Sequence, residues 1–555
     1  MVPFDLLALP TDLFLEILGH LQPKDIMNIG LSCRDLALLA TPVYLARRGL
    51  PDPETSCTIR PSWNGYSDKV TALTFNFSLV SVQQFHCVFT EPKARGVFKV
   101  SLLTWNIRRV NKFISRLSSI GNATIALYPY SLHTDSMRDF MPAFVELLET
   151  ILQKCNSLQV SHPSPYSMAF NTNYRFELLE STTALIWQGI RRLFVKYLSF
   201  RTEDHFLEGS DWRYKKIPRR NPIPLSKSPL QLQSKLTTLD LSSDFLLLPP
   251  FSPWIFGALK CSPISSLTLS LLTSIPAEEF RHFIFPWIID AVPRLEEIKI
   301  SFSYRDSLFV VVQSMSSFPL LRKITFGGQD FNLPPTLLSS AECNMVHFIS
   351  FTGTLDQAVY FFAQPMSFPS LKFINVVYDL VRTNNPNILQ LSNSDSLSTK
   401  FSILDKRLSE MNIEPLITMC LLPHGTTAQP QIPQDELELE KLNGVSRLNI
   451  ALPFFSGPED KTLVSQASYV RLCLALFHDV KALSLVFRDR QSPLNALSQE
   501  ARRSTIQAAV LKDHPSVISF DIAYDPFEVF HGHWRNSSNN SNRHRHPESC
   551  VCSDF

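Results

Sequence analysis

Glycine is scarce in this chain. There are 16 glycines and 39 prolines among the 555 residues, whereas average usage is about 7 % glycine and about 5 % proline. Loops that cradle phosphate groups depend on glycine, and neither G-x-G-x-x-G nor G-x-x-x-x-G-K-[ST] occurs in the sequence. The sequence therefore argues against dinucleotide binding and against phosphoryl transfer by a P-loop.

A large excess of charge of either sign is also missing. The 52 Lys and Arg residues nearly balance the 50 Asp and Glu residues, which gives a net charge of +2. Because nucleic-acid-binding domains usually carry a basic patch, we expect no nucleic-acid partner. The chain is too long for one core, which usually stops growing near about 250–300 residues, so we expect several domains or a repeat array.

Signals for export, membrane insertion and metal binding are absent as well. The N-terminus lacks a basic segment followed by an apolar one, and no run of about 18 apolar residues occurs. None of the ten cysteines belongs to a C-x-x-C pair, which weakens any zinc-ribbon interpretation. We expect a cytoplasmic and/or nuclear protein without membrane association, with reduced thiols and with neither a metal nor another cofactor.

The first fifty residues have a character of their own. The segment FDLLALPTDLFLEILGHLQPKDIMNIGLSCRDLALLA predicts three short helices. Pro10, Thr11 and Asp12 provide the chemistry of a helix start, and apolar residues then recur at helical spacing. Pro23 ends this stretch and begins the next helix.

The spacing in this segment resembles an F-box, written L-P-x-x-[LIV]-x-x-x-I-L-x-x-L, then D-[LIV], then [SV]-C-[RK]. An F-box docks on a Skp-type adaptor, which joins it to the cullin and RING subunits of a ubiquitin ligase. The tryptophan that usually follows the last motif is absent, so Leu36 or Leu39 must fill that space. The resemblance implies that the adaptor is bound by Leu9, Pro10, Leu13, Ile17, Leu18, Leu21, Asp25, Ile26, Cys33 and Arg34.

Simple physics is consistent with a docking role. About 45 residues in three helices cannot bury all of their apolar surface, so an exposed patch should remain for a partner. The alternative is a helical cap on the following domain, as is common in repeat proteins. A cap does not require Leu-Pro, Asp-Ile and Ser-Cys-Arg at these spacings.

One apolar pattern, Φ-x-x-Φ-x-Φ, recurs through the remainder of the chain. Six successive copies starting at 236, 264, 295, 321, 346 and 371 are 25 to 31 residues apart, near the 20–29-residue period of leucine-rich repeats. Proline stands two residues before four copies, and amphipathic segments such as 140–152 and 462–478 lie between copies. The full set of copies starts at Val70, Val100, Cys155, Ile190, Leu236, Ile264, Leu295, Leu321, Val346, Leu371, Val445, Val480 and Val517.

The copies resemble the irregular repeats of F-box proteins with leucine-rich-repeat-like regions. This implies an α/β chain with a three-helix F-box at 1–50, a linker at 51–69 and a solenoid at 70–530 with a parallel sheet on its concave face. Insertions are expected near 201–235 and 379–440, with a degenerate strand unit near 401–403 and a disordered tail at 531–555. The alternative is a globular α/β domain with a doubly wound sheet.

Target recognition would then lie on the open face of the sheet. Side chains between the last two Φ positions point away from the core, because successive strand residues face opposite sides. They are mostly small and polar, so they do not identify the target. These candidate residues are Phe194, Asp240, Thr268, Lys299, Thr325, Asn375, Asn449, Ser484 and Asp521.

Motifs for catalysis are missing: the sequence contains no H-E-x-x-H, no G-x-S-x-G and no kinase signature set. The basic and aromatic segment 212–224 is best interpreted as a solvated insertion, and the His and Cys residues of the tail as part of a disordered segment. We expect a non-catalytic adaptor subunit that presents an unknown protein substrate to a ligase. The alternatives are a binding scaffold without a ligase, and a hydrolase without a known motif.

Overall fold

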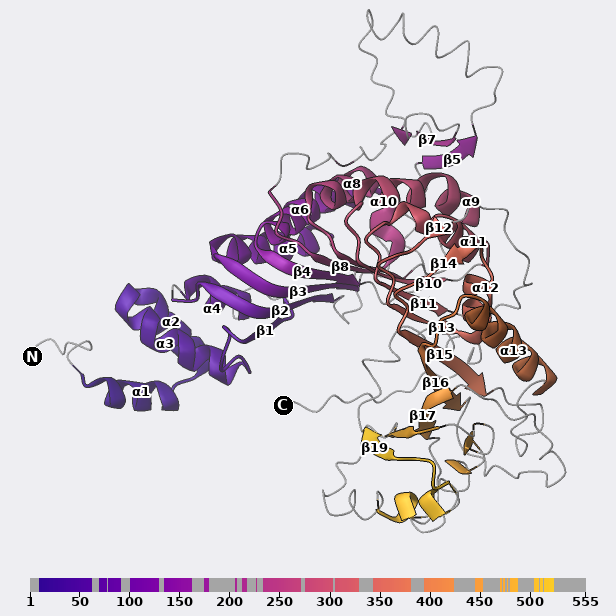
Figure 1. The fold of residues 1–555 in the computed structure, drawn as a ribbon. Coiled ribbons are helices and arrows are strands. Elements are labelled where there is room, and N and C mark those ends of the chain that lie inside the picture. The colour runs from indigo at the N-terminus through magenta and orange to yellow at the C-terminus, as the bar shows by residue number, and fades with distance from the viewer. Residues whose placement is uncertain are drawn as a thin grey trace, which may run out of the picture. The chain divides into compact units, whose positions relative to one another are not determined.

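The computed structural model divides the chain into two compact units, Met1–Leu295 and Glu296–Arg545. Both are mixed α/β structures built on parallel strands (Figure 1). The structure describes residues 9–61, 69–76, 78–90, 100–128, 134–161, 174–178, 205–206, 212–216, 226, 233–270, 275–302, 305–328, 343–380, 394–423, 445–452, 470–471, 473–474, 477, 480–487, 504–508, 510–512 and 514–523.

The chain begins with the three helices that the sequence predicts. They are α1 (Thr11–His20), α2 (Pro23–Ser32) and α3 (Arg34–Arg47). Pro10 is the N-cap of α1, and Pro23 is the first residue of α2, where its missing N–H costs no hydrogen bond. Cys33 has extended backbone angles and separates α2 from α3.

The first unit continues with a parallel sheet. Its strands are adjacent in chain order: β1 (Ser56–Ile59), β2 (Ser81–Thr90), β3 (Ser119–Tyr128), β4 (Cys155–Ser161), β8 (Thr238–Ser242) and β9 (Ser266–Ser270). The helical segments of this unit after α3 are α4 (Lys69–Phe75), α5 (Val100–Arg116), α6 (Thr134–Leu152), η3 (Asp244–Leu247), α8 (Ser252–Cys261), α9 (Ala277–Glu279), the π-helical turn η4 (Phe280–Ile284) and α10 (Phe285–Ala291).

The second unit repeats this arrangement. Its parallel strands are also adjacent in chain order: β10 (Glu297–Phe302), β11 (Lys323–Gly328), β13 (Ser350–Thr354), β15 (Phe373–Leu380), β16 (Leu416–Pro423), β17 (Val445–Leu452), β18 (Ala482–Phe487) and β19 (Ser519–Ala523). Between them lie α11 (Arg305–Gln313), η5 (Met315–Ser317), α12 (Leu355–Phe362), α13 (Ser394–Glu410) and the short parallel pair β12 (Cys343–Asn344) and β14 (Met366–Ser367).

Strand order distinguishes these sheets from the doubly wound alternative. A doubly wound sheet reverses its strand order at a switch point. Within each unit here, the strands of the parallel sheet lie side by side in the order in which they occur along the chain, without a reversal. The prediction of an α/β chain with a parallel sheet after N-terminal helices is confirmed.

The recurring apolar pattern fills the core. In β8, Leu239 and Leu241 are buried, and the residues that alternate with them are half-buried. In the second unit the pattern brings aromatic rings together, because Phe351 of β13 stacks on Phe361 of α12 with ring centroids 5.2 Å apart. The apolar stripe predicted at 140–152 lies on α6 and is buried, including Phe140 and Phe144.

Two predicted strands are wrong. The copies that start at Val70 and Val100 lie in the helices α4 and α5. Their first two Φ positions are three residues apart, a spacing that a helix face shares with the strand pattern. On α5 the burial of Leu103, Ile107 and Val110 continues with helical period, which decides between the two.

Four strands of the parallel sheets were not predicted: β1, β2, β3 and β16. β1 lies within 51–69, so the linker prediction is wrong for 56–59. In β1 and β16 the first Φ position is occupied by Glu54 and Glu414, which hides the pattern. Residues 401–403, where a degenerate strand unit was expected, lie in the helix α13. The described strand between β15 and β17 is instead β16.

Two further interpretations change. The copy assigned to Val346 starts two residues later, because Phe348 and Phe351 are buried while Val346 is 48 % exposed. Residues 212–216 of the basic segment form β7, which pairs antiparallel with β5 (Tyr174–Leu178) and β6 (His205–Phe206). The copy at Ile190 and the tail 531–555 lie outside the described residues.

Candidate functional site: a helical docking face and a polar sheet face

Helices α2 and α3 pack closely because small residues line their contact. Gly30 on α2 is buried, and a Cβ at this position would lie 3.4 Å from the Cβ of Ala40 on α3. Ala37 and Thr41 of α3 are buried on the same side. Small side chains at a helix crossing allow the backbones to approach, so this contact fixes the two helices relative to each other.

Helix α1 is held to α3 by an arginine. The guanidinium of Arg47, near the end of α3, donates hydrogen bonds to the carbonyl oxygens of Gly19 and Leu21 at the end of α1. A cation at this position satisfies terminal carbonyls and complements the negative end of the helix dipole. Phe14 and Leu18 are the buried residues of α1.

The packing leaves a set of apolar side chains exposed. Leu13 and Ile17 follow each other by one turn of α1 and are 50 % and 45 % exposed. Leu15 of α1, Leu31 of α2 and Leu38 of α3 are also among the exposed large apolar residues. A short helical segment that leaves this many large apolar side chains exposed to solvent is typical of a docking site.

The predicted adaptor-binding residues fall into three groups. Leu18 and Ile26 are fully buried and support the helices from inside. Leu9 and Leu21 are half-buried. Pro10, Leu13, Ile17, Asp25, Cys33 and Arg34 are exposed. The sequence motif does not include Leu15, Leu31 and Leu38, because their exposure depends on how the three helices pack.

The second candidate surface is the polar face of the first unit's sheet. Asp240 of β8, predicted as a recognition residue, lies level with Gln159 of β4, whose side-chain amide donates to its carboxylate at 2.9 Å. The hydroxyl of Ser242 donates to the other carboxylate oxygen at 2.8 Å. Thr124 of β3 is hydrogen-bonded to Gln159 at 3.4 Å, so the chain of contacts crosses three strands.

This row is longer than the sequence indicated. Strand registers align one residue from each strand, in the order Thr58, His86, Thr124, Gln159, Asp240 and Thr268. Asp240 and Thr268 were predicted. Thr58, His86 and Thr124 were missed because their strands were not predicted, and Gln159 was missed although the copy at Cys155 was predicted. Partial burial, together with the positive charge of Arg60, lowers the pKa of His86, so this row carries little positive charge near neutral pH.

The second unit has a corresponding row. Lys299, Thr325, Thr352, Asn375 and Thr418 are level on adjacent strands, and all but Thr418 are half-buried. The amide of Asn375 donates to the hydroxyl of Thr352 at 3.2 Å. Three of the five were predicted from the pattern.

A register shift divides the predicted row. Between β16 and β17 the pairing skips a residue, so Thr418 is level with Arg447, and Asn449 is level with Cys420. Asn449, Ser484 and Asp521 therefore continue a different row from that of Asn375. A β-bulge re-aims side chains in this way, and the sequence pattern does not reveal it. Phe194 lies outside the described residues.

In the described part of the chain, side chains that could act in catalysis do not come together. Burial raises the pKa of the Cys57 and Cys155 thiols to about 12 and that of Cys420 to about 11, so these thiols are not nucleophiles near neutral pH. The described residues contain no group of three or more His, Cys, Asp or Glu side chains that could hold a metal ion. Among the described helices, none combines the length and apolarity needed to cross a bilayer.

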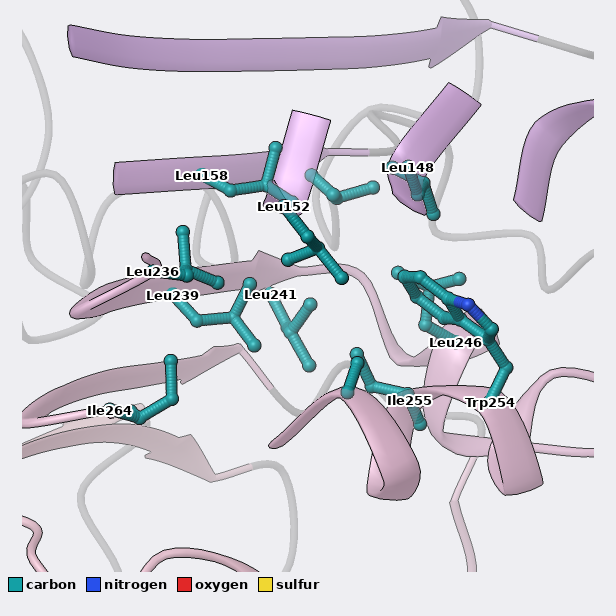
Figure 2. A pocket seen from close by; sticks show the side chains of 12 residues that line it. Leu148, Leu152, Leu158, Leu236, Leu239, Leu241, Leu246, Trp254, Ile255 and Ile264 are labelled. Carbon is teal, nitrogen blue, oxygen red and sulfur yellow. The ribbon is translucent and has the colours of Figure 1, made fainter. Parts of the chain in front are cut away.

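An internal hollow in the first unit is apolar throughout. Figure 2 shows leucine side chains of α6, β8 and the η3 turn converging with Trp254 and Ile255 of α8. The indole N–H of Trp254 donates to a carboxylate oxygen of Glu149 at 3.2 Å. All twelve lining side chains are apolar or aromatic, so the hollow is part of the packed interior and offers no acid, base or nucleophile.

Comparison with known proteins assigns a class to the N-terminal helices. A family model of the F-box domain matches residues 6–45, so the three helices form an F-box domain. The match supports an F-box protein, and F-box domains generally bind Skp-type adaptors. An F-box in general suggests an adaptor role in a ubiquitin ligase of the Skp–cullin–F-box type. A search of curated proteins found no match to the chain.

Proposed function

We propose that this chain is the substrate-recognition subunit of a Skp–cullin–F-box ubiquitin ligase. The observation that carries the proposal is the F-box match at 6–45 together with the exposed apolar face on α1, α2 and α3. A Skp-type adaptor would cover Leu13 and Ile17 and link the chain to cullin and RING subunits. The chain would supply no catalysis of its own and would act in the cytoplasm, the nucleus or both.

The region after the F-box would serve as the target-binding part. We propose that its chain-ordered parallel strands form a leucine-rich-repeat-like solenoid, in which each strand and helix pair buries its apolar face against its neighbours. The open sheet face would hold the polar rows of Asp240 and Asn375. Its contribution to the reaction would be proximity, because a bound target is presented at high effective concentration.

Copurification tests the docking step. Leu13→Asp combined with Ile17→Asp should abolish copurification with a coexpressed Skp-type adaptor, because a carboxylate buried in an apolar interface lacks a partner. Val80→Asp is the matched control, since Val80 is 55 % exposed but lies outside the F-box. Circular dichroism establishes that each variant is folded. Undiminished adaptor binding by the double variant would refute the assignment of the docking face.

A further inference from the structure

Exposed apolar side chains in the second unit gather at one edge of its sheet. All of the large apolar residues described as exposed in this unit lie within four residues before a strand or at its first residue. They are Leu320, Val346, Phe373, Leu416 and Ile518, with exposed fractions of 41 %, 48 %, 44 %, 39 % and 83 %. Because the strands are parallel, their first residues meet at one edge, which we call the amino edge.

Phe373 and Leu416 form the centre of this edge. They are paired directly across β15 and β16, and neighbouring strands lie about 4.8 Å apart. Both point to the same side of the sheet as Asn375 and Thr418, two residues further along each strand. Two large, partly exposed apolar side chains side by side form a continuous apolar spot.

The described residues around this spot carry more positive than negative charge. At the neighbouring β10 and β11, charges are balanced, because Arg322 and Glu296 form an ion pair at 3.7 Å and Lys323 lies level with Glu297. Among the residues that the structure describes at β15 to β18, Lys372, Arg447 and Lys481 are exposed cations and Glu414 is an exposed acid. No ion-pair partner is described for these three cations within the part of the chain that the structure covers.

We propose that the amino edge of β15–β18 binds a target polypeptide segment that presents apolar side chains flanked by Asp or Glu. The apolar spot supplies anchor contacts, and the surrounding cations favour acidic flanks by charge complementarity. The proposal rests on the proposed function only in taking the bound polypeptide to be the ligase's target. Binding itself requires neither the F-box nor the adaptor.

Charge and geometry favour this partner over two others. A second copy of the chain meeting this edge symmetrically would place like charges opposite each other, which disfavours association. A membrane-binding face needs apolar side chains that insert well below the headgroups. Phe373 and Leu416 lie on strands within the sheet and are more than half covered, so they offer little to insert.

Peptide probes test the proposal on the full-length chain. The first probe is a fluorescein-labelled 15-residue peptide with Leu and Phe at its centre and three Glu residues on each side. The second carries Lys in place of Glu, and the third carries Ser in place of Leu and Phe. We expect the first to bind about tenfold more tightly than either of the others by fluorescence anisotropy, with its advantage over the Lys probe reduced at high salt.

Variants connect the binding to the edge. Phe373→Ser with Leu416→Ser should weaken binding of the Glu-flanked probe about tenfold, whereas Val80→Ser in the first unit should not. Lys372→Glu with Lys481→Glu removes no apolar contact and should reverse the preference between Glu and Lys flanks. If Phe373→Ser with Leu416→Ser lowers stability, the charge reversal at Lys372 and Lys481 still tests where the peptide binds.

Several results would overturn the proposal. These are equal binding of the Glu and Lys probes, an unchanged affinity in the Phe373 and Leu416 double variant, or binding of phosphatidylserine vesicles that depends on these residues and outcompetes the peptide. Loss of adaptor binding in Leu13→Asp with Ile17→Asp is measured separately. Failure at the amino edge is therefore distinguishable from failure of the F-box assignment.

Discussion

Individual glycines have clear roles in a chain that has few of them. A Cβ on Gly121 in β3 would lie 2.5 Å from the carbonyl oxygen of Gln83 in β2, a separation that backbone atoms cannot relieve by rotating. A Cβ on Gly19 in α1 would meet nothing within 4 Å. The close approach of backbone to backbone, rather than a phosphate loop, explains why glycine is required at Gly121.

This difference predicts opposite effects of the same substitution. Gly121→Ala should lower the free energy of unfolding by about 1–3 kcal/mol, because strands β2 and β3 must separate. Gly19→Ala should raise it by about 0.5–1 kcal/mol, because alanine favours the helix. Urea unfolding followed by circular dichroism measures both. A neutral Gly121→Ala would show that the strand pair can move apart without cost.

His86 connects stability to pH. Its folded-state pKa lies below the ordinary value of about 6.5, chiefly because of partial burial and further because of Arg60. Below pH 6.5 the unfolded chain binds a proton at this position before the folded chain does, so stability falls as pH falls towards the folded pKa. His86→Gln should therefore reduce the loss of Tm between pH 7.5 and pH 5.5. An identical pH profile in the variant would contradict this role.

At the level of residues, the sequence predicted which side chains are buried better than it predicted which side chains bond to each other. The apolar positions of the copies in β8 and β15 are buried as the pattern indicates, because alternation in a strand fixes the side that each side chain faces. The hydrogen bond from Gln159 to Asp240 joins residues that are 81 positions apart. Such pairs depend on which strands become neighbours, and the pattern of a single strand contains no information about that.

At the level of elements, cations at helix ends recur. Arg407 of α13 donates to the carbonyl oxygens of Phe362 and Gln364 at the end of α12, at 3.0 and 3.2 Å. Lys154 donates to the carbonyl oxygens of Ile114, Ser115 and Leu117 at the end of α5. Together with Arg47 at the end of α1, these contacts tie helices to segments that follow them in the chain, where no glycine is available as a C-cap.

Removing one of these cations tests whether its hydrogen bonds to the helix-end carbonyls stabilise the fold. Arg407→Met keeps the aliphatic stem and should lower the free energy of unfolding by about 1–2 kcal/mol, because two terminal carbonyls lose a charged donor. Lys406→Met is the matched control, since Lys406 is exposed on the same helix. Thermal unfolding of the two variants gives the comparison. Equal Tm values would mean that water replaces the guanidinium without loss.

Two features of the pattern explain the errors at α4, α5, β1 and β16. A pattern with apolar residues at positions 1, 4 and 6 contains the helical spacing of three as well as the strand spacing of two, so α4 and α5 resembled strands. Conversely, Glu54 and Glu414 occupy the first position in β1 and β16. The first position precedes the paired strand residues, so a polar residue is tolerated there and the pattern misses the strand.

For the whole molecule, the two candidate surfaces should function separately. The F-box face lies in α1, α2 and α3, whereas the amino edge with Phe373 and Leu416 belongs to the second compact unit. Substitutions at sites without shared partners usually act additively. Leu13→Asp with Ile17→Asp should abolish adaptor copurification and leave the affinity for the Glu-flanked peptide unchanged. Phe373→Ser with Leu416→Ser should do the reverse.

A reconstituted reaction joins both surfaces in one measurement. A reporter protein that carries the Glu-flanked peptide should be ubiquitinated by the ligase assembled on the wild-type chain, because the amino edge holds it near the catalytic subunits. Either pair of substitutions should reduce the rate to that of a reporter without the peptide, and the four together should reduce it no further. If the Phe373 and Leu416 variant ubiquitinated the reporter at the wild-type rate, the reporter would be held by another surface of the chain.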